Sequence, residues 1–203
     1  MGNFYYYDIF TDVRGIFIMK LNVFAYIFLL FAYIFFVTCA RAENIHFNKD
    51  IYILKTINQS VVENRFENEY YPQNDTADNW GKLIGIYYYP DIKNVLNFAR
   101  DKEKNIEEQN NVVLLKFIEN KKQNKAVLSY LVTGEWKDRI YFEHNIYKYE
   151  PHPKKGTMVL RYAKRYFFDN KEEVINIGHE IKNINDDLME QIIISPIPPI
   201  VEE

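Results

Sequence analysis

The chain has 203 residues and a nearly balanced charge, with 25 Lys and Arg against 28 Asp and Glu, and it contains one cysteine. This balance argues against a protein that binds nucleic acid, because such a protein needs a basic face to displace the counterions of the phosphate backbone. A single cysteine excludes an intramolecular disulfide, so the fold must be held by its core.

Residues 21–40 contain no charged side chain; they follow Lys20 and end in the sequence Ala40-Arg41-Ala42. A basic residue, an apolar core and small residues at the −3 and −1 positions of a cleavage site are the three parts of a secretory signal peptide. We therefore predict that residues 19–42 are a signal peptide. The mature protein would begin at Glu43 and would be periplasmic or secreted.

The same apolar segment allows a second interpretation. Its 20 residues are enough for a helix that crosses the hydrocarbon core of a bilayer, so an uncleaved inner-membrane anchor is the alternative. The membrane is expected as a partner only in that case. Residues 1–18 carry Asp8 and Asp12 against Arg14, which is a poor start for a signal, and we interpret them as a start-site extension before Met19.

After the signal, the sequence predicts a β-hairpin followed by a short helix. Residues 45–57 and 61–71 are rich in Ile, Val, Tyr and Phe, and the polar residues 58–60 between them predict a turn. Thr76 is a suitable N-cap for a helix. Three apolar residues would share one face of that helix: Trp80, Leu83 and Ile84.

A strand at residues 86–89 and a second helix are predicted next. Pro90 ends the strand, and Asp91 is a suitable N-cap for the helix. The apolar residues of this helix recur at spacings of three and four: Ile92, Val95, Leu96 and Ala99.

From Asn111 the hydrophobic period changes to 2, which predicts a meander of four antiparallel strands. Their expected ranges are 112–119, 126–135, 139–150 and 157–168. Asp169 or Asn170 then caps a last helix. Its expected buried stripe consists of Val174, Ile177, Ile181, Ile184 and Leu188.

These elements predict a single α+β domain over residues 43–191, in which helices pack on an antiparallel sheet. Residues 192–203 contain three prolines and are expected to form an extended C-terminal tail.

Two short segments resemble a known group of proteins. Residues 68–72, with the sequence Asn-Glu-Tyr-Tyr-Pro, and the following Asn79 and Trp80 are similar to uncharacterised small exported bacterial proteins. The order of elements over residues 44–188 resembles the α/β/α sandwich of PsbP/Mog1-like proteins. This resemblance implies a fold and a non-catalytic role, and it transfers no active-site residue.

The sequence predicts no catalytic, cofactor-binding or metal-binding residue. Ser60, Ser129 and Ser195 lie outside any Gly-x-Ser-x-Gly motif, and no two histidines have the i, i+4 spacing of helical metal ligands. Two alternatives remain open. His144 and His152 would form a site if the fold brought them together, and residues 74–79 offer oxygen ligands for calcium, although an Asx-rich turn explains them better.

Tyrosines on the expected strands suggest a protein-binding face. Tyr147 and Tyr149 share one face of their strand, and Arg161 and Arg165 share one face of the next. We expect these four residues to form an interface for a protein partner, because tyrosine gives a large contact area at a small entropy cost. The alternative is that the tyrosines pack within the sheet and the arginines are solvated.

The function that these patterns favour is a non-enzymatic, exported protein of a bacterial envelope with a protein-binding or accessory role. Alternatives from other classes are a membrane-tethered domain, a periplasmic immunity-type protein, and a hydrolase or metal enzyme that uses His144 or His152.

Overall fold

The computed structural model describes residues 44–201, which belong to one compact unit. The predicted signal segment and the expected cleavage point before Glu43 lie outside the described residues. No helix within 44–201 is long and apolar enough to cross a membrane.

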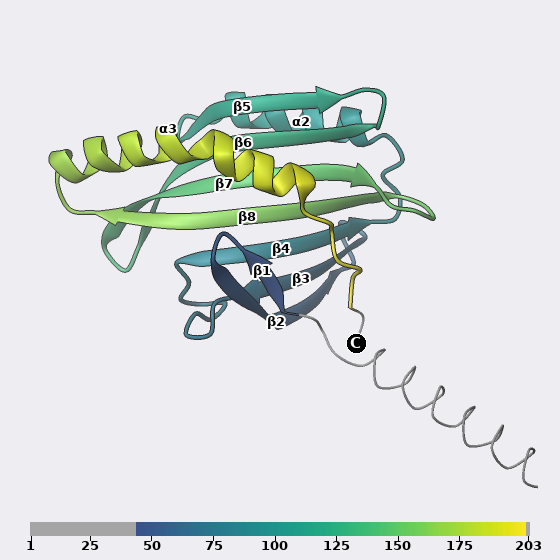
Figure 1. Cartoon of the computed structure of the whole chain (residues 1–203), viewed down its shortest axis with the longest axis horizontal. Coiled ribbons are helices and arrows are strands. Elements are labelled where there is room, and N and C mark those ends of the chain that lie inside the picture. The colour runs from purple at the N-terminus through teal and green to yellow at the C-terminus, as the bar shows by residue number, and fades with distance from the viewer. Residues whose placement is uncertain (1–43, 202–203) are drawn as a thin grey trace, which may run out of the picture. The chain divides into compact units, whose positions relative to one another are not determined.

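Eight strands form one antiparallel sheet in the order β1-β2-β3-β4-β8-β7-β6-β5 (Figure 1). The elements are β1 (Ile45–Phe47), β2 (Asp50–Ser60), β3 (Arg65–Tyr71), β4 (Lys82–Tyr89), α2 (Val95–Glu107), β5 (Val112–Asn120), β6 (Lys125–Trp136), β7 (Arg139–Pro151), β8 (Thr157–Phe168) and α3 (Lys171–Ile194).

The predicted α+β class is wrong. The chain forms a curled antiparallel half-barrel in which 49% of the described residues lie in strands and 23% in helices, and the two described helices do not build the α/β/α sandwich of PsbP/Mog1-like proteins. The error lies in the segment after β3, where a helix was expected from Thr76.

That segment forms a tight turn followed by β4. Thr76 and Asn79 pair across the turn, and the Asp75 carboxylate accepts hydrogen bonds from the backbone N–H groups of Gly81 (2.8 Å) and Lys82 (3.3 Å). β4 is a central strand buried on both faces, so its apolar residues form a continuous run without the period of 2. Leu83 and Ile84 therefore belong to a strand.

The four-strand meander is confirmed, with each boundary within one residue of the prediction. β5, β6, β7 and β8 pair consecutively, and β8 then pairs with β4. The first hairpin is also present, but its turn lies at residues 61–64 rather than at 58–60. Asn64 adopts a φ of 44° there, a left-handed conformation that asparagine tolerates.

The two helices cover opposite faces of the sheet (Figure 1). α2 begins after Asn94, whose side chain accepts the backbone N–H of Asn97 (3.0 Å); the predicted cap, Asp91, lies further upstream. α3 begins after Asn170, one of the two predicted caps, and Asn170 Oδ1 accepts the N–H of Glu173 (3.0 Å). Both caps satisfy amide groups that the helix leaves without partners.

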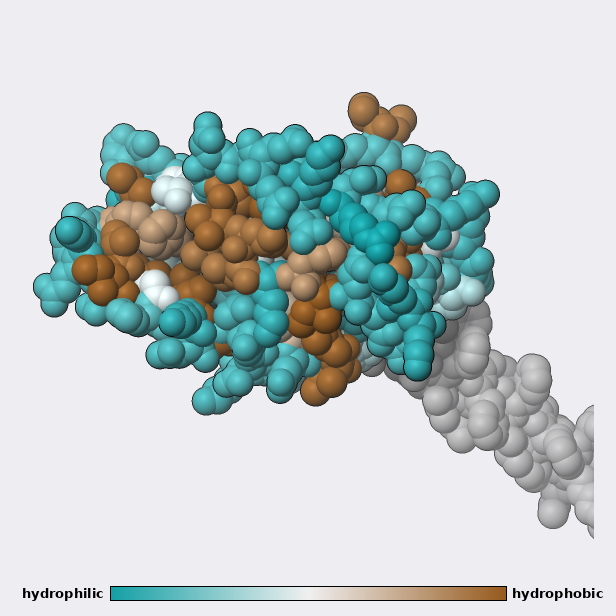
Figure 2. All heavy atoms as spheres, turned by 90° about the horizontal axis from the view of Figure 1, so that it is seen from above, coloured by the Kyte–Doolittle hydropathy of each residue, from teal (hydrophilic) through white to brown (hydrophobic). Residues whose placement is uncertain are grey.

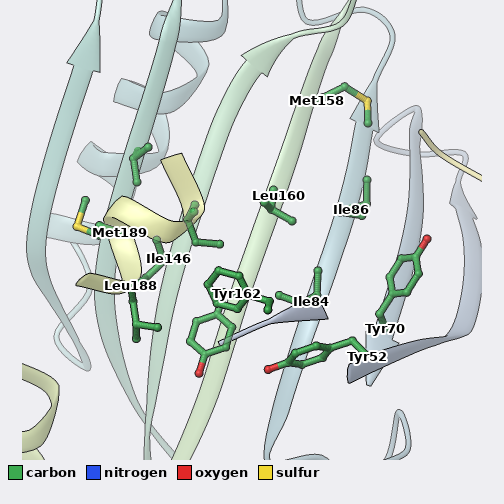
Figure 3. Close-up of a cluster of buried hydrophobic side chains, with 13 residues drawn as sticks. Tyr52, Tyr70, Ile84, Ile86, Ile146, Met158, Leu160, Tyr162, Leu188 and Met189 are labelled. Atoms are coloured by element: carbon green, nitrogen blue, oxygen red, sulfur yellow. The ribbon is translucent and has the colours of Figure 1, made fainter. Parts of the chain in front are cut away.

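The larger core lies between α3 and the sheet. Leu188 and Met189 of α3 lie over Ile146 of β7, beside the rings of Tyr162 and Tyr52 (Figure 3). The predicted stripe on α3 is partly wrong, because Val174, Ile177 and Ile184 are only half-buried. The helix residues that are fully covered are Ile181, Asn185, Leu188, Met189 and Ile192.

The C-terminal tail begins at Ser195, three residues later than predicted, because α3 continues to Ile194. Two buried side chains attach it to the sheet. Lys148 Nζ donates to the carbonyl of Ser195 (2.7 Å), and the Asn68 amide accepts from the N–H of Val201 (2.6 Å) and donates to its carbonyl (3.0 Å). The tail is therefore a tied part of the fold.

Replacing Trp80 with alanine should destabilise the protein by about 3–5 kcal/mol through lost apolar transfer and the cavity left behind. Trp80 is only 9% exposed and packs with Tyr71, Leu83 and Ala163. Chemical denaturation measures the change. The matched control is Trp136→Ala, because Trp136 is less buried and should cost less. Equal losses for the two variants would contradict this role of Trp80.

Candidate functional site

A pocket of about 590 Å³ lies on the face of the sheet that α2 covers. Alternate residues of β3, β4, β8 and β7 point into it because successive side chains of a strand face opposite sides. α2 contributes Phe98 and Lys102, which are four residues apart and so lie on one side of the helix. We call this cavity the α2-side pocket.

Arg161 of β8 lies in the wall of this pocket and has all of its nitrogen atoms engaged. It donates to the Glu143 carboxylate (2.7 Å), to Asn145 Oδ1 (3.0 Å) and to the Tyr87 hydroxyl (3.4 Å). The second oxygen of Glu143 accepts from Arg165 Nε (3.0 Å). The buried Glu143 carboxylate thus binds the guanidinium groups of both Arg161 and Arg165. The three side chains together carry one net positive charge.

Tyrosine rings form the neighbouring part of the wall. The ring of Tyr147 is stacked between those of Tyr130 and Tyr149, with centroid distances of 5.8 Å and 6.1 Å. Phe98 of α2 meets Tyr149 edge to face, at 5.8 Å. Burial raises the pKa of Tyr149 well above its usual range, so its hydroxyl stays neutral.

The structure brings the four predicted interface residues together, but not on an open face. Tyr147, Tyr149 and Arg161 line the α2-side pocket, and Arg165 lies beside them with its guanidinium 3.7 Å from the centre of the Trp80 ring. The expectation of two solvent-facing tyrosines is wrong, because Tyr149 is only 2% exposed. α2 covers this part of the sheet, and strand periodicity could not show which face a helix would cover.

The opposite wall of the pocket comes from β3 and the turn before it, which the sequence analysis missed. Arg65 pairs with Glu63 (2.6 Å) and with Glu67 (2.8 Å), and Glu69 accepts a short hydrogen bond from the Tyr71 hydroxyl. Burial and the nearby charge of Glu69 raise the pKa of Glu67. The signal was present in the alternation of charged residues at positions 63, 65, 67 and 69.

Lys102 differs from the other charged residues of the pocket. Its ammonium lies 5.9 Å from the centre of the Tyr130 ring, and no ion pair with a carboxylate forms within residues 44–201. Burial, and then repulsion by Arg161, lowers the pKa of Lys102. Glu63 acts on this ammonium only at longer range, so the pocket contains one cation that forms no contact ion pair with the described residues.

A buried polar cluster on the α3 side joins Ser129, His144 and Asn185. Ser129 Oγ and Asn185 Oδ1 both lie near His144 Nε2, at 3.2 Å and 2.9 Å, and Nδ1 has no hydrogen-bond partner among the described residues. In a catalytic triad the acidic group holds the ring nitrogen that faces away from serine. This cluster has a different geometry, and both Ser129 and His144 are fully buried.

The two remaining candidates for metal binding form turns. His152 lies in the β7–β8 loop, where its Nδ1 faces the backbone N–H groups of Lys154 and Lys155 and its ring lies 4.6 Å from that of Tyr88. Residues 74–79 form the turn before β4, in which Asp75 is a hydrogen-bond acceptor. Within residues 44–201, no three His, Cys, Asp or Glu side chains come together in a metal-binding arrangement.

His144 should make the stability of the protein depend on pH. Burial lowers its pKa from 6.5 to about 4, so the unfolded chain binds the proton first as the pH falls. The stability linked to neutral His144 is therefore complete above pH 6.5 and is lost as the pH falls toward 4. Denaturation at about pH 7 and about pH 5 should differ by about 2 kcal/mol more in wild type than in His144→Gln. Equal pH dependence in the two proteins would refute this assignment.

A protein-family model matches residues 40–197, a range that includes nearly all of the described residues. No curated protein and no solved structure matches the chain.

Proposed function

The chain belongs to the protein family whose model matches residues 40–197, and we propose that it is a non-catalytic, exported binding protein of a bacterial envelope that holds its ligand in the α2-side pocket. The observation that carries this proposal is the convergence of Tyr147, Arg161 and Lys102 on one cavity of about 590 Å³. A cavity of this size with aromatic walls and a few placed charges is typical of a site for a small molecule.

The composition of the pocket supports binding rather than nucleophilic catalysis. Its lining contains no serine, threonine, cysteine or histidine. Its two arginines are engaged by carboxylates, Arg65 by Glu67 and Arg161 by Glu143, which lies outside the lining. Such pairing fixes the shape of the walls, whereas an acid or base catalyst must be able to exchange a proton with its substrate.

A second candidate is protein binding at the edge strand β5. Among the described strands, β5 has no neighbour at its outer edge, and three of its apolar residues are exposed: Val113, Leu115 and Ile118. Figure 2 shows hydrophobic side chains gathered between hydrophilic ones on the side of the molecule where β5 lies in Figure 1. An unpaired strand with apolar side chains is a template for strand addition by a partner.

Two substitutions separate these candidates. Tyr147→Ser should weaken ligand binding in the pocket by about tenfold or more, because interface energy concentrates in a few aromatic residues. Val113→Asp, at the exposed edge, should leave pocket binding unchanged. Ligand-observed NMR against a library of small molecules measures both variants, with circular dichroism as the folding control. Loss of small-molecule binding in Val113→Asp, with binding retained in Tyr147→Ser, would contradict the pocket proposal.

The export part of the proposal rests on the pattern of residues 19–42, and the family match begins at residue 40, beside the expected cleavage point. Protein recovered from the periplasm of the native host should begin at Glu43 by intact mass, because the signal is cleaved after Ala42. Retention of residues 21–40 in a membrane fraction after alkaline washing would instead support the tethered alternative.

A further inference from the structure

The charges in the walls of the α2-side pocket are separated. On the β3 side, Glu63, Glu67 and Glu69 face a single cation, Arg65. On the α2 and β8 side lie Lys102 and Arg161, and Arg161 shares Glu143 with Arg165. The pocket therefore has an acidic wall and a basic wall.

The two walls differ in whether their charges already have partners. Each glutamate of the acidic wall is engaged: Glu63 and Glu67 with Arg65, and Glu69 with the hydroxyl of Tyr71. On the basic wall, Arg161 is engaged by Glu143, Asn145 and Tyr87. Lys102 is partly buried and forms no ion pair within the described part of the chain. A buried charge without a partner is costly, and an anion beside it removes that cost.

Building on the proposed binding function, we propose that the α2-side pocket takes a small organic acid with one carboxylate. The carboxylate pairs with the Lys102 ammonium, and the organic body of the ligand lies against the Tyr147 ring. Lys102 comes from α2 and Tyr147 from β7, and both line the pocket, so one ligand that fills it would contact both elements.

The acidic wall limits the charge of the ligand. A phosphate group or a dicarboxylate would bring a second negative charge toward Glu63, Glu67 and Glu69, and like charges in a partly desolvated cavity repel strongly. A positively charged group elsewhere on the ligand would be tolerated on that side. The pocket thus favours monocarboxylates, including zwitterions, over polyanions.

Lowering of the Lys102 pKa by burial and by Arg161 is consistent with this assignment, because a bound carboxylate would stabilise the protonated ammonium. The binding of an acid should therefore raise the pKa of Lys102, and calorimetry at alkaline pH in buffers of different ionisation enthalpy can detect the resulting proton uptake.

The test is a panel of aromatic and aliphatic monocarboxylates, phenylacetate and 3-phenylpropionate among them, each paired with its neutral amide, together with phenyl phosphate. Binding to protein purified after expression of the full chain is measured by ligand-observed NMR and calorimetry. We expect acids to bind more tightly than their amides. Lys102→Met should weaken acid binding by about tenfold to a hundredfold, the range expected for a charged hydrogen bond.

Lys104→Met is the matched control, because Lys104 is exposed on the same helix and does not line the pocket. It should leave acid binding unchanged, and unchanged thermal midpoints show that both variants fold. Amides that bind as well as acids, a Lys102→Met variant with unaltered affinity, or tighter binding of phenyl phosphate would each overturn the carboxylate assignment.

The outcomes also separate this inference from the proposed function. If the amides bind equally well and Tyr147→Ser abolishes their binding, the pocket is a binding site for a different ligand class. If no member of the panel binds to the wild-type protein, the carboxylate inference fails. If, in addition, no compound in the wider library shows binding that Tyr147→Ser weakens, the pocket function is rejected as well.

Discussion

The pairing of β4 with β8 is the contact on which both the sheet and the α2-side pocket depend. It joins the N-terminal strands to the C-terminal meander, and its register places Gly85 opposite Arg161 and Tyr87 opposite Val159. A side chain at Gly85 would collide with the ring of Tyr87. The absence of one there lets that ring lie across the strand, where its hydroxyl reaches Arg161 at 3.4 Å. A slip of one residue would exchange the faces of β8 and bring Arg161 into the apolar core under α3.

β8 also shows how one strand serves two environments. Its even-numbered residues Met158, Leu160 and Tyr162 belong to the core covered by α3, whereas Val159 and Arg161 line the pocket covered by α2. Both faces are covered, so the strand has no clean alternation of apolar and polar residues. Glu143 compensates the charges of Arg161 and Arg165 on the pocket side, because its carboxylate accepts hydrogen bonds from both.

The sequence predicted those parts of the fold in which local pattern and tertiary environment agree. The strands of the meander and the Asn170 cap follow from period, turn residues and capping chemistry. The prediction of a helix at residues 76–84 is wrong because a strand buried on both faces and the buried face of a helix have similar apolar runs. Only the pairing of β4 with β3 and β8 distinguishes the two structures. The sequence placed Tyr147 and Arg161 on two different strands. That they lie directly opposite each other follows only from the register between β7 and β8. The sequence did not single out Lys102 as a site residue, because lysines are common on exposed helix faces.

The attachment of the tail has a consequence for the order in which the fold can be completed. The side chain of Asn68, in β3, forms two hydrogen bonds with Val201 of the tail, and β4 is a central strand only because it pairs with β8. β1 to β4 can pair with one another as soon as they are made, whereas the second neighbour of β4 and the hydrogen bonds of Asn68 to Val201 require β8 and the tail. The sheet is therefore completed by one pairing between strands that are distant in sequence, and such long-range contacts slow folding.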